Sequence, residues 1–230
     1  MTTVLLIRHG RSTANTAGVL AGRTPGVNLD ERGEAQAVEL AARLMPVHLD
    51  AVVASPLERT RQTAERLVAG RDETLCEVDE RFTEGDYGTW SGRTLSSLAE
   101  EPLWRTVQAH PAAVAFPDGE ALAALSARAV AAVRAWNAKL GEQAAYAVVS
   151  HGDVIKAIAA DALGLHLDLF QRINVDPCSL TVIRYHGTRP TMLRLNDVGG
   201  DVSALIRKAE EPAAEAGEAG DAPVGGGAGA

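Results

Sequence analysis

Two short apolar segments, each followed by a histidine and a glycine, constrain this chain more than any other feature. Residues 4–7 are followed by Arg8-His9-Gly10, and residues 144–149 are followed by Ser150-His151-Gly152. Uninterrupted apolar runs of this length predict strands that are buried on both faces of a parallel sheet. The ends of such strands open onto the crevice where active sites form. We therefore expect His9 and His151 to line one pocket.

The rest of the chain alternates between strand-like and helix-like segments. Strand-like runs cover residues 3–7, 51–54, 144–149, 180–185 and 191–195, and helical stretches cover residues 30–45, 56–68, 119–140 and 153–163. This alternation predicts an α/β fold, a three-layer α/β/α sandwich with a mostly parallel sheet. The last two strand runs flank a short turn at residues 186–188, which predicts an antiparallel strand at one edge.

Capping signals predict where two of the helices begin. Asp30 is placed to cap one helix, and Pro46 is placed to end it. Ser55, Pro56 and Glu58 follow the pattern of a capping box, with Ser55 at the N-cap and Pro56 in the first helical position. A helix that starts here carries Arg59 in its first turn, where the helix dipole favours anions.

Two segments depart from the alternation. Residues 81–117 contain three glycines, three prolines and two of the three tryptophans, and we expect them to form a short cap insertion over the pocket. Residues 209–230 are acidic and rich in alanine and glycine, and we expect them to be a disordered tail. The expected domain organisation is one catalytic domain over residues 1–208 followed by this tail.

The composition excludes several classes of function. The net charge is −8, of which the tail supplies −5, so the remaining body is only mildly acidic. Binding to a nucleic acid backbone needs a basic face, so we expect no nucleic acid partner, whereas a small phosphorylated metabolite needs only local positive charge. No stretch approaches the roughly 20 apolar residues that cross a bilayer, so we expect no membrane partner and a cytoplasmic protein. The sequence leaves open whether the chain forms a homo-oligomer.

The predicted pocket offers the groups that phosphoryl transfer requires. His9 is the candidate nucleophile, because a neutral imidazole nitrogen can attack phosphorus directly. Arg8 and Arg59 are candidates for binding phosphate, because a guanidinium matches two phosphate oxygens at once. We expect His151 to make a further contact to the same phosphate. A metal site at His9 and His151 is disfavoured, because the remaining histidines show no ligand spacing.

A general acid is harder to identify from the residues alone. Glu84 lies at the start of the glycine-rich segment, and Asp86 and Glu80 compete with it for this role. Weaker candidates for contacts to the substrate are small or polar residues near the strand ends, namely Ser12, Asn15, Gly22 and Gly152. We expect Asp153 to be a capping acid in the first turn of a helix.

Five motifs in this order resemble the histidine phosphatase superfamily, the phosphoglycerate-mutase-like group. They are Leu6-Ile7-Arg8-His9-Gly10 with Asn15, Leu29-Asp30-Glu31-Arg32-Gly33 with Gln36-Ala37, Ser55-Pro56-Leu57-Glu58-Arg59-Thr60 with Gln62-Thr63-Ala64, Glu84 with Tyr87-Gly88-Thr89-Trp90, and Ser150-His151-Gly152. The resemblance covers about residues 2–195.

The resemblance implies a role for each matching residue. It implies that His9 is phosphorylated, that Glu84 is the proton donor, and that Arg8, Arg59 and His151 line the phosphate pocket with Asn15 in support. For phosphatase members it implies no metal and no dissociable organic cofactor.

The chain also departs from the family pattern. It carries Trp90-Ser91-Gly92 where many members have Trp-Glu-Gly, and its cap lacks the paired arginines that hold a carboxylate in true mutases, since Arg93 and Arg105 are isolated. We therefore expect a phosphatase. A phosphoglycerate-type phosphomutase and a non-catalytic binder of a phosphorylated ligand are the alternatives.

Overall fold

A computed structural model of the chain describes residues 1–72 and 74–199 and contains one six-stranded sheet. Its spatial order is β3-β2-β4-β1-β5-β6. The strands have the following bounds: β1 (Thr2–Arg8), β2 (Ala51–Ala54), β3 (Leu75–Val78), β4 (Ala145–Ser150), β5 (Leu180–His186) and β6 (Arg189–Asp197).

The register of the two central strands brings the two histidines to the same level. Strands β1 and β4 are parallel neighbours, and Arg8 pairs with Ser150 at their carboxyl ends. The backbone N–H of His9 donates to the carbonyl of Ser150 at 3.0 Å, which extends the ladder by one step. His9 and His151 therefore leave the sheet side by side.

The other strands complete a mixed sheet. Strand β2 is parallel to both β4 and β3, whereas β5 is antiparallel to β1 and β6 is antiparallel to β5. The four parallel strands are joined by crossovers, and the β5–β6 pair forms the expected hairpin. The predicted α/β fold with an antiparallel edge is confirmed.

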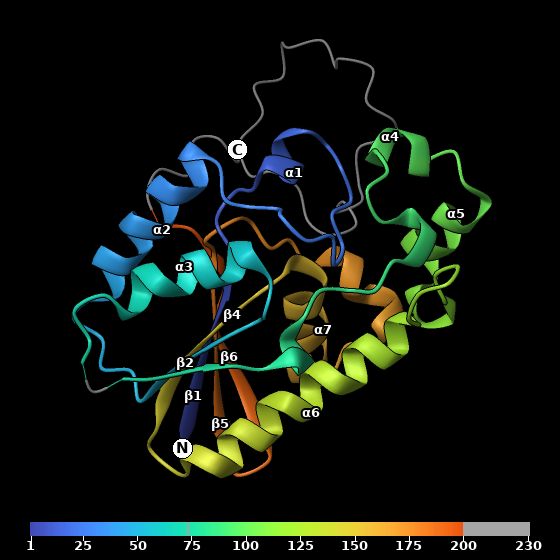
Figure 1. Cartoon of the computed structure of the whole chain (residues 1–230). Helices are drawn as coiled ribbons and strands as arrows, with labels where there is room; N and C mark the ends of the chain where they lie inside the picture. Colours follow the sequence, from blue (N-terminus) through green and yellow to red (C-terminus); the bar gives the residue numbers. More distant parts are fainter. Residues whose placement is uncertain (73, 200–230) are drawn as a thin grey trace, which may run out of the picture.

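Helices cover both faces of the sheet, α2 and α3 on one and α6 and α7 on the other (Figure 1). The α-helices have the following bounds: α1 (Thr13–Thr16), α2 (Glu31–Leu44), α3 (Glu58–Val68), α4 (Leu95–Leu98), α5 (Pro102–Ala109), α6 (Leu122–Leu140) and α7 (Gly152–Leu163). Short 3-10 helices are η1 (Glu80–Phe82), η2 (Gly88–Trp90), η3 (Pro111–Ala113) and η4 (Leu167–Arg172).

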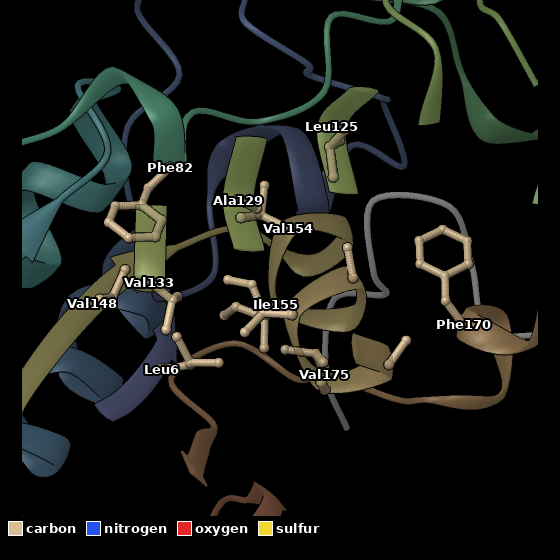
Figure 2. Close-up of a cluster of buried hydrophobic side chains, with 14 of the residues drawn as sticks. Leu6, Phe82, Leu125, Ala129, Val133, Val148, Val154, Ile155, Phe170 and Val175 are labelled. Atoms are coloured by element: carbon tan, nitrogen blue, oxygen red, sulfur yellow. The ribbon is translucent and has the colours of Figure 1, made fainter. Parts of the chain in front are cut away.

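Alternate residues of β1 enter two separate cores. Leu5 and Ile7 pack with α2 and α3, whereas Val4 and Leu6 pack with α6 and α7. Figure 2 shows the second cluster, in which Leu6 lies among side chains from β4, α6 and α7. Each of these fully buried aliphatic side chains stabilises the fold by about 1.5–3 kcal/mol relative to an exposed one. Burial on both faces explains why the sequence of β1 is a continuous apolar run.

Two local predictions were wrong. Helix α3 begins at Glu58 with Leu57 as the N-cap residue, so Ser55 and Pro56 form no capping box. Helix α6 begins at Leu122 and not at residue 119. By contrast, Asp30 caps α2 as predicted, because its Oδ1 accepts from the N–H of Gly33 at 2.8 Å.

The insertion at residues 81–117 is ordered by its aromatic side chains. Trp90 stacks on Trp104 with ring centroids 6.2 Å apart and meets the edge of Phe116 at 5.4 Å. Trp90 and Phe116 belong to the same core as α6 and α7, so the insertion packs against the main body. No helix of the described residues is long and apolar enough to span a membrane. The predicted tail, 209–230, and the expected domain end at 208 lie outside the described residues.

Candidate functional site

The site forms where β1 and β4 end. Arg8, His9 and His151 are all buried, with side chains at most 3% exposed. The rings of His9 and His151 lie with their centroids 5.3 Å apart, edge to face. The two strand ends therefore bring these side chains together.

Arg59, from the first turn of α3, links the two histidines. Its Nε lies 3.2 Å from Nε2 of His9, and its Nη2 lies 3.3 Å from Nδ1 of His151. Nη2 also donates to the carbonyl of Gly22 at 2.9 Å. The guanidinium is only 2% exposed, so α3 delivers a fixed cation into the pocket.

The hydrogen bonds of His9 define its tautomer. Nδ1 lies 2.7 Å from the carbonyl of Gly10, which can only accept, so Nδ1 carries the proton. Nε2 then holds a lone pair, which accepts the hydrogen bond from Nε of Arg59. The lone pair that a nucleophile needs therefore lies on the ring nitrogen that faces Arg59.

Close packing of the backbone fixes the loop that follows His9. A Cβ on Gly10 would collide with the carbonyl oxygen of Gly33, at the start of α2. The N–H of Gly10 donates to Oγ1 of Thr63 on α3 at 3.1 Å. Contacts from two helices therefore hold His9, because only glycine at these positions allows the chains to approach so closely.

The electrostatic surroundings keep His9 neutral. Burial, followed by the charges of Arg59 and Arg8, lowers its pKa well below 6.5. Burial also lowers the pKa of Arg8, to about 10, which still leaves Arg8 charged at neutral pH. At neutral pH the pocket thus combines an uncharged imidazole with two guanidinium groups.

His151 is oriented by Ser55. Oγ of Ser55 lies 2.7 Å from Nε2 of His151, the contact that replaces the predicted capping role of Ser55. Burial and the charge of Arg59 lower the pKa of His151 well below 6.5. His151 is therefore neutral, and its 4.0 Å contact with Oε2 of Glu84 is not an ion pair.

Glu84 brings a carboxyl group to the pocket from the segment that follows η1. It is 4% exposed, and its Oε1 accepts from the N–H of Gly85 at 2.9 Å. Burial and the negative charge of Asp153 raise its pKa to about 7, against the lowering effects of Arg59 and Arg8. A carboxyl group with this pKa can both give and take a proton near neutral pH.

The competing acids lie in different settings. Glu80 is exposed, and Asp86 is half-buried, with its Oδ1 accepting from the N–H of Gly88 at 3.1 Å. Only Glu84 of the three contacts one of the two histidines among the interactions of the described residues. The geometry therefore favours Glu84.

The remaining candidates fall into two groups. Gly22 contributes its carbonyl to Arg59, and Gly152 begins α7 directly after His151. Ser12 and Asn15 instead cap helix α1, where Oδ1 of Asn15 accepts from the N–H and Oγ of Ser12 at 3.0 and 2.9 Å. Oδ1 of Asn15 and the hydroxyl of Ser12 are thus engaged with each other.

Arg128 and Glu120, which lie around the backbone of Glu84, escaped the sequence reasoning. Arg128 on α6 and Arg23 both donate to the carbonyl of Glu84, at 3.1 and 2.9 Å, and so fix its backbone. Glu120 accepts from both arginines, and its carboxylate offsets part of their charge. Contacts between positions so far apart in the chain leave no local pattern that could reveal them.

Asp153 lies in the first turn of a helix as expected, and the structure adds contacts that the sequence did not indicate. It lies in the first turn of α7, but it is fully buried and its Oδ2 accepts from the hydroxyl of Tyr87 at 2.8 Å. Oδ1 lies 3.6 Å from Nζ of Lys156, which is also fully buried. Asp153 therefore also belongs to a buried polar cluster.

The charge of the site suits a phosphate group. Arg59 Nη1 is buried and has no hydrogen-bond partner among the residues that the structure describes. A buried cationic donor without an acceptor is costly, and an anion in the pocket would supply the missing acceptor. Within the described ranges, no cluster of three or more His, Cys, Asp or Glu residues could hold a metal ion.

Comparisons with known proteins agree with this geometry. Residues 4–198 match the histidine phosphatase superfamily (branch 1). The chain is 33% identical over 204 residues to phosphoserine phosphatase 1 of Hydrogenobacter thermophilus, covering 85% of this chain and 92% of the relative. It is 32% identical over 211 residues to a protein of Erwinia tasmaniensis named probable phosphoglycerate mutase GpmB, covering 89% and 95%.

A solved structure gives the same result. YhfR of Bacillus stearothermophilus matches with a TM-score of 0.81 and 28% identity, covering 86% of this chain and 98% of that chain. The sequence motifs, the fold and the relatives agree, which confirms the resemblance inferred from the motifs. The chain belongs to the histidine phosphatase superfamily.

Proposed function

We propose that this protein hydrolyses phosphomonoesters through a phosphohistidine intermediate on His9. The observation that carries the proposal is the neutral His9, whose Nε2 lone pair faces the guanidinium of Arg59 while Glu84 lies across the pocket beside His151. A nucleophile, a cationic phosphate site and a proton donor thus surround one small volume.

The first step transfers the phosphoryl group to His9. Nε2 attacks phosphorus, the bond from phosphorus to the ester oxygen breaks, and Glu84 gives its proton to the departing oxygen. Arg8 and Arg59 balance the charge on the other phosphate oxygens. The Nδ1 hydrogen bond to the carbonyl of Gly10 stabilises the ring as positive charge develops on it.

The second step returns the enzyme to its starting state. Water attacks the phosphohistidine while the ionised Glu84 takes one of its protons, and the bond from phosphorus to Nε2 breaks. Inorganic phosphate leaves, His9 is again neutral and Glu84 is again protonated. A pKa near 7 allows Glu84 to serve as acid in one step and as base in the next.

A phosphomutase is the second candidate, because one group of relatives carries the name probable phosphoglycerate mutase. A mutase must also hold the carboxylate of its substrate. In the insertion, Arg93 forms a 2.6 Å ion pair with Glu101, and Arg105 is exposed. This arrangement favours hydrolysis. Incubation with 3-phosphoglycerate and a bisphosphate primer separates the two, since a mutase forms the isomer and a phosphatase releases inorganic phosphate.

The proposal includes the partner and the compartment. We propose a small phosphorylated metabolite as the substrate. Phosphoserine is the first candidate, because one relative is named phosphoserine phosphatase 1. We also propose that the reaction needs no metal or organic cofactor and takes place in the cytoplasm, without nucleic acid or membrane partners. A homo-oligomer is compatible with these proposals.

The mechanism is tested by measuring the release of phosphate from a panel of alkyl and aryl phosphates, with wild-type protein and with His9→Ala. We expect wild-type protein to turn over several esters, with and without a metal chelator, and His9→Ala to lose turnover. His186→Ala, which removes an exposed histidine at the end of β5, is the matched control and should keep full activity. Turnover by His9→Ala at the wild-type rate would refute the assignment.

A further inference from the structure

A chain of buried polar side chains lies behind the phosphate pocket, and the mechanism above does not use it. Tyr87, Asp153 and Lys156 are each 0% exposed, and Gln171 is 4% exposed. The hydroxyl of Tyr87 donates to Oδ2 of Asp153 at 2.8 Å, and Nζ of Lys156 donates to Oε1 of Gln171 at 3.0 Å. Nζ of Lys156 also lies 3.6 Å from Oδ1 of Asp153.

Burying this carboxylate and this ammonium is costly. Removing two charges from water costs several kcal/mol per ion, and replacing such a pair by apolar side chains is often neutral or stabilising. Elsewhere α7 buries only apolar or small side chains and contributes them to the core. Stability alone therefore does not explain why Asp153 and Lys156 are buried here. We infer that their charges influence the neighbouring site.

Tyr87 connects this chain to the proton donor. A Cβ on Gly85 would lie 2.7 Å from Cε1 and 3.2 Å from the hydroxyl oxygen of Tyr87, so the phenol packs against the residue that follows Glu84. Burial and the charges and hydrogen bonds of Asp153 and Glu84 together raise the pKa of Tyr87 well above its usual value. The hydroxyl thus lies between two carboxyl groups and stays protonated.

Asp153 acts on Glu84 through its charge. After burial, the negative charge of Asp153 is the largest influence raising the pKa of Glu84. The other charged or titratable groups that face Glu84 from the elements around it are Arg8 of β1, Arg59 of α3, His151 after β4, and Lys156 of α7. Arg128 of α6 binds the carbonyl of Glu84 and not its carboxyl group.

We propose that Asp153, held by Tyr87 and Lys156, is a positioning residue that sets the pH range in which Glu84 can act as the proton donor. The inference rests on the proposed function, because it assigns Glu84 the role of acid. The charge of Asp153 acts on Glu84 and also on Arg8, which stays charged at neutral pH. The ammonium of Lys156, 3.6 Å from Oδ1, stabilises the buried carboxylate of Asp153.

The test is the pH profile of kcat/KM for an alkyl phosphate in Asp153→Asn. The substitution keeps the shape and removes the charge, so the alkaline limb should move to lower pH by about one unit, the effect typical of a nearby like charge. The profile for an aryl phosphate, whose leaving group needs no proton, should not move. Tyr146→Phe is the matched control, because it removes a buried hydroxyl that donates to Asn137 at 2.9 Å, away from the site.

Two further variants keep the test decisive. If Asp153→Asn does not fold, the double variant Asp153→Asn/Lys156→Gln removes both charges and should still move the limb downward. The shift should be smaller, because the loss of the Lys156 ammonium acts in the opposite direction. An alkaline limb at the wild-type pH in whichever variant folds overturns the inference. Glu84→Gln separates this failure from that of the proposed function, because an unchanged limb in Glu84→Gln means that Glu84 is not the acid at all.

Discussion

The pKa of Glu84 leads to a quantitative prediction about leaving groups. Glu84 must be protonated to assist an alkyl oxygen, and its pKa of about 7 places this change within the working range. The protonated fraction falls from about three quarters at pH 6.5 to about 3% at pH 8.5, so kcat/KM for an alkyl phosphate should fall about 25-fold over this interval.

The nucleophile does not titrate in that interval, and the substrate titrates only at its lower end. The pKa of His9 lies well below 6.5, so the imidazole is neutral throughout. A phosphate monoester has its second pKa near 6, so it is largely dianionic above pH 6.5. The slope of the profile should therefore report Glu84 alone.

The assay compares phosphoserine with p-nitrophenyl phosphate at matched pH values and constant ionic strength. We expect a steep fall for the alkyl ester and a nearly flat profile for the aryl ester. Glu84→Gln should lower the alkyl rate at pH 6.5 by about 10²–10⁴-fold and remove the slope. Parallel profiles for the two esters, or an equal loss for both in Glu84→Gln, would show that the acid lies elsewhere.

Three further predictions concern the pocket. Ser55→Ala removes the hydroxyl 2.7 Å from Nε2 of His151 and should cost about 1 kcal/mol of stability and about tenfold in kcat/KM; unchanged kinetics would separate Ser55 from catalysis. Arg59→Lys loses the planar fork and should weaken inhibition by inorganic phosphate about 10- to 100-fold, so an unchanged inhibition constant would remove Arg59 from the phosphate site. The pKa values of His9 and His151 are lowered, so below pH 6.5 the unfolded chain binds protons that the folded chain does not. The contribution of these two histidines to stability is therefore lost as the pH falls. The raised pKa of Glu84 acts in the opposite direction. The two histidines outnumber the one carboxyl group, so these three groups together should lower the melting temperature on acidification below pH 6.5. A melting temperature that rises on acidification there would contradict the assigned pKa shifts.

The centre of the fold could be predicted because its pattern is local and strong. Strand β1 is buried on both faces, and its sequence is therefore an unbroken apolar run. The end of this run also pointed to His9 as a candidate site residue. Strand β3 was missed because it is four residues long and exposed at the edge of the sheet, where burial imposes no pattern. The hairpin of β5 and β6 was found from the turn between them.

The failures at the site have one physical cause. Ser55 fits a capping box locally, but its hydroxyl contacts His151, which lies 96 positions away in the chain. Asp153 looks like a first-turn acid, but Tyr87 and Lys156 enclose it. For Ser55 a tertiary contact replaced the predicted capping role, and for Asp153 tertiary contacts were added to its expected place in the first turn. Local patterns carry no information about such contacts.

The identity of the phosphorylated atom tests the central claim most directly. Wild-type protein and Glu84→Gln, mixed briefly with a ³²P-labelled aryl phosphate and quenched in alkali, should carry label on the peptide that contains His9. That label should be stable to base and lost in acid, as a nitrogen–phosphorus bond requires, and it should be absent from His9→Ala. Label that persists in His9→Ala, or turnover by the wild-type protein without label on this peptide, would contradict the account.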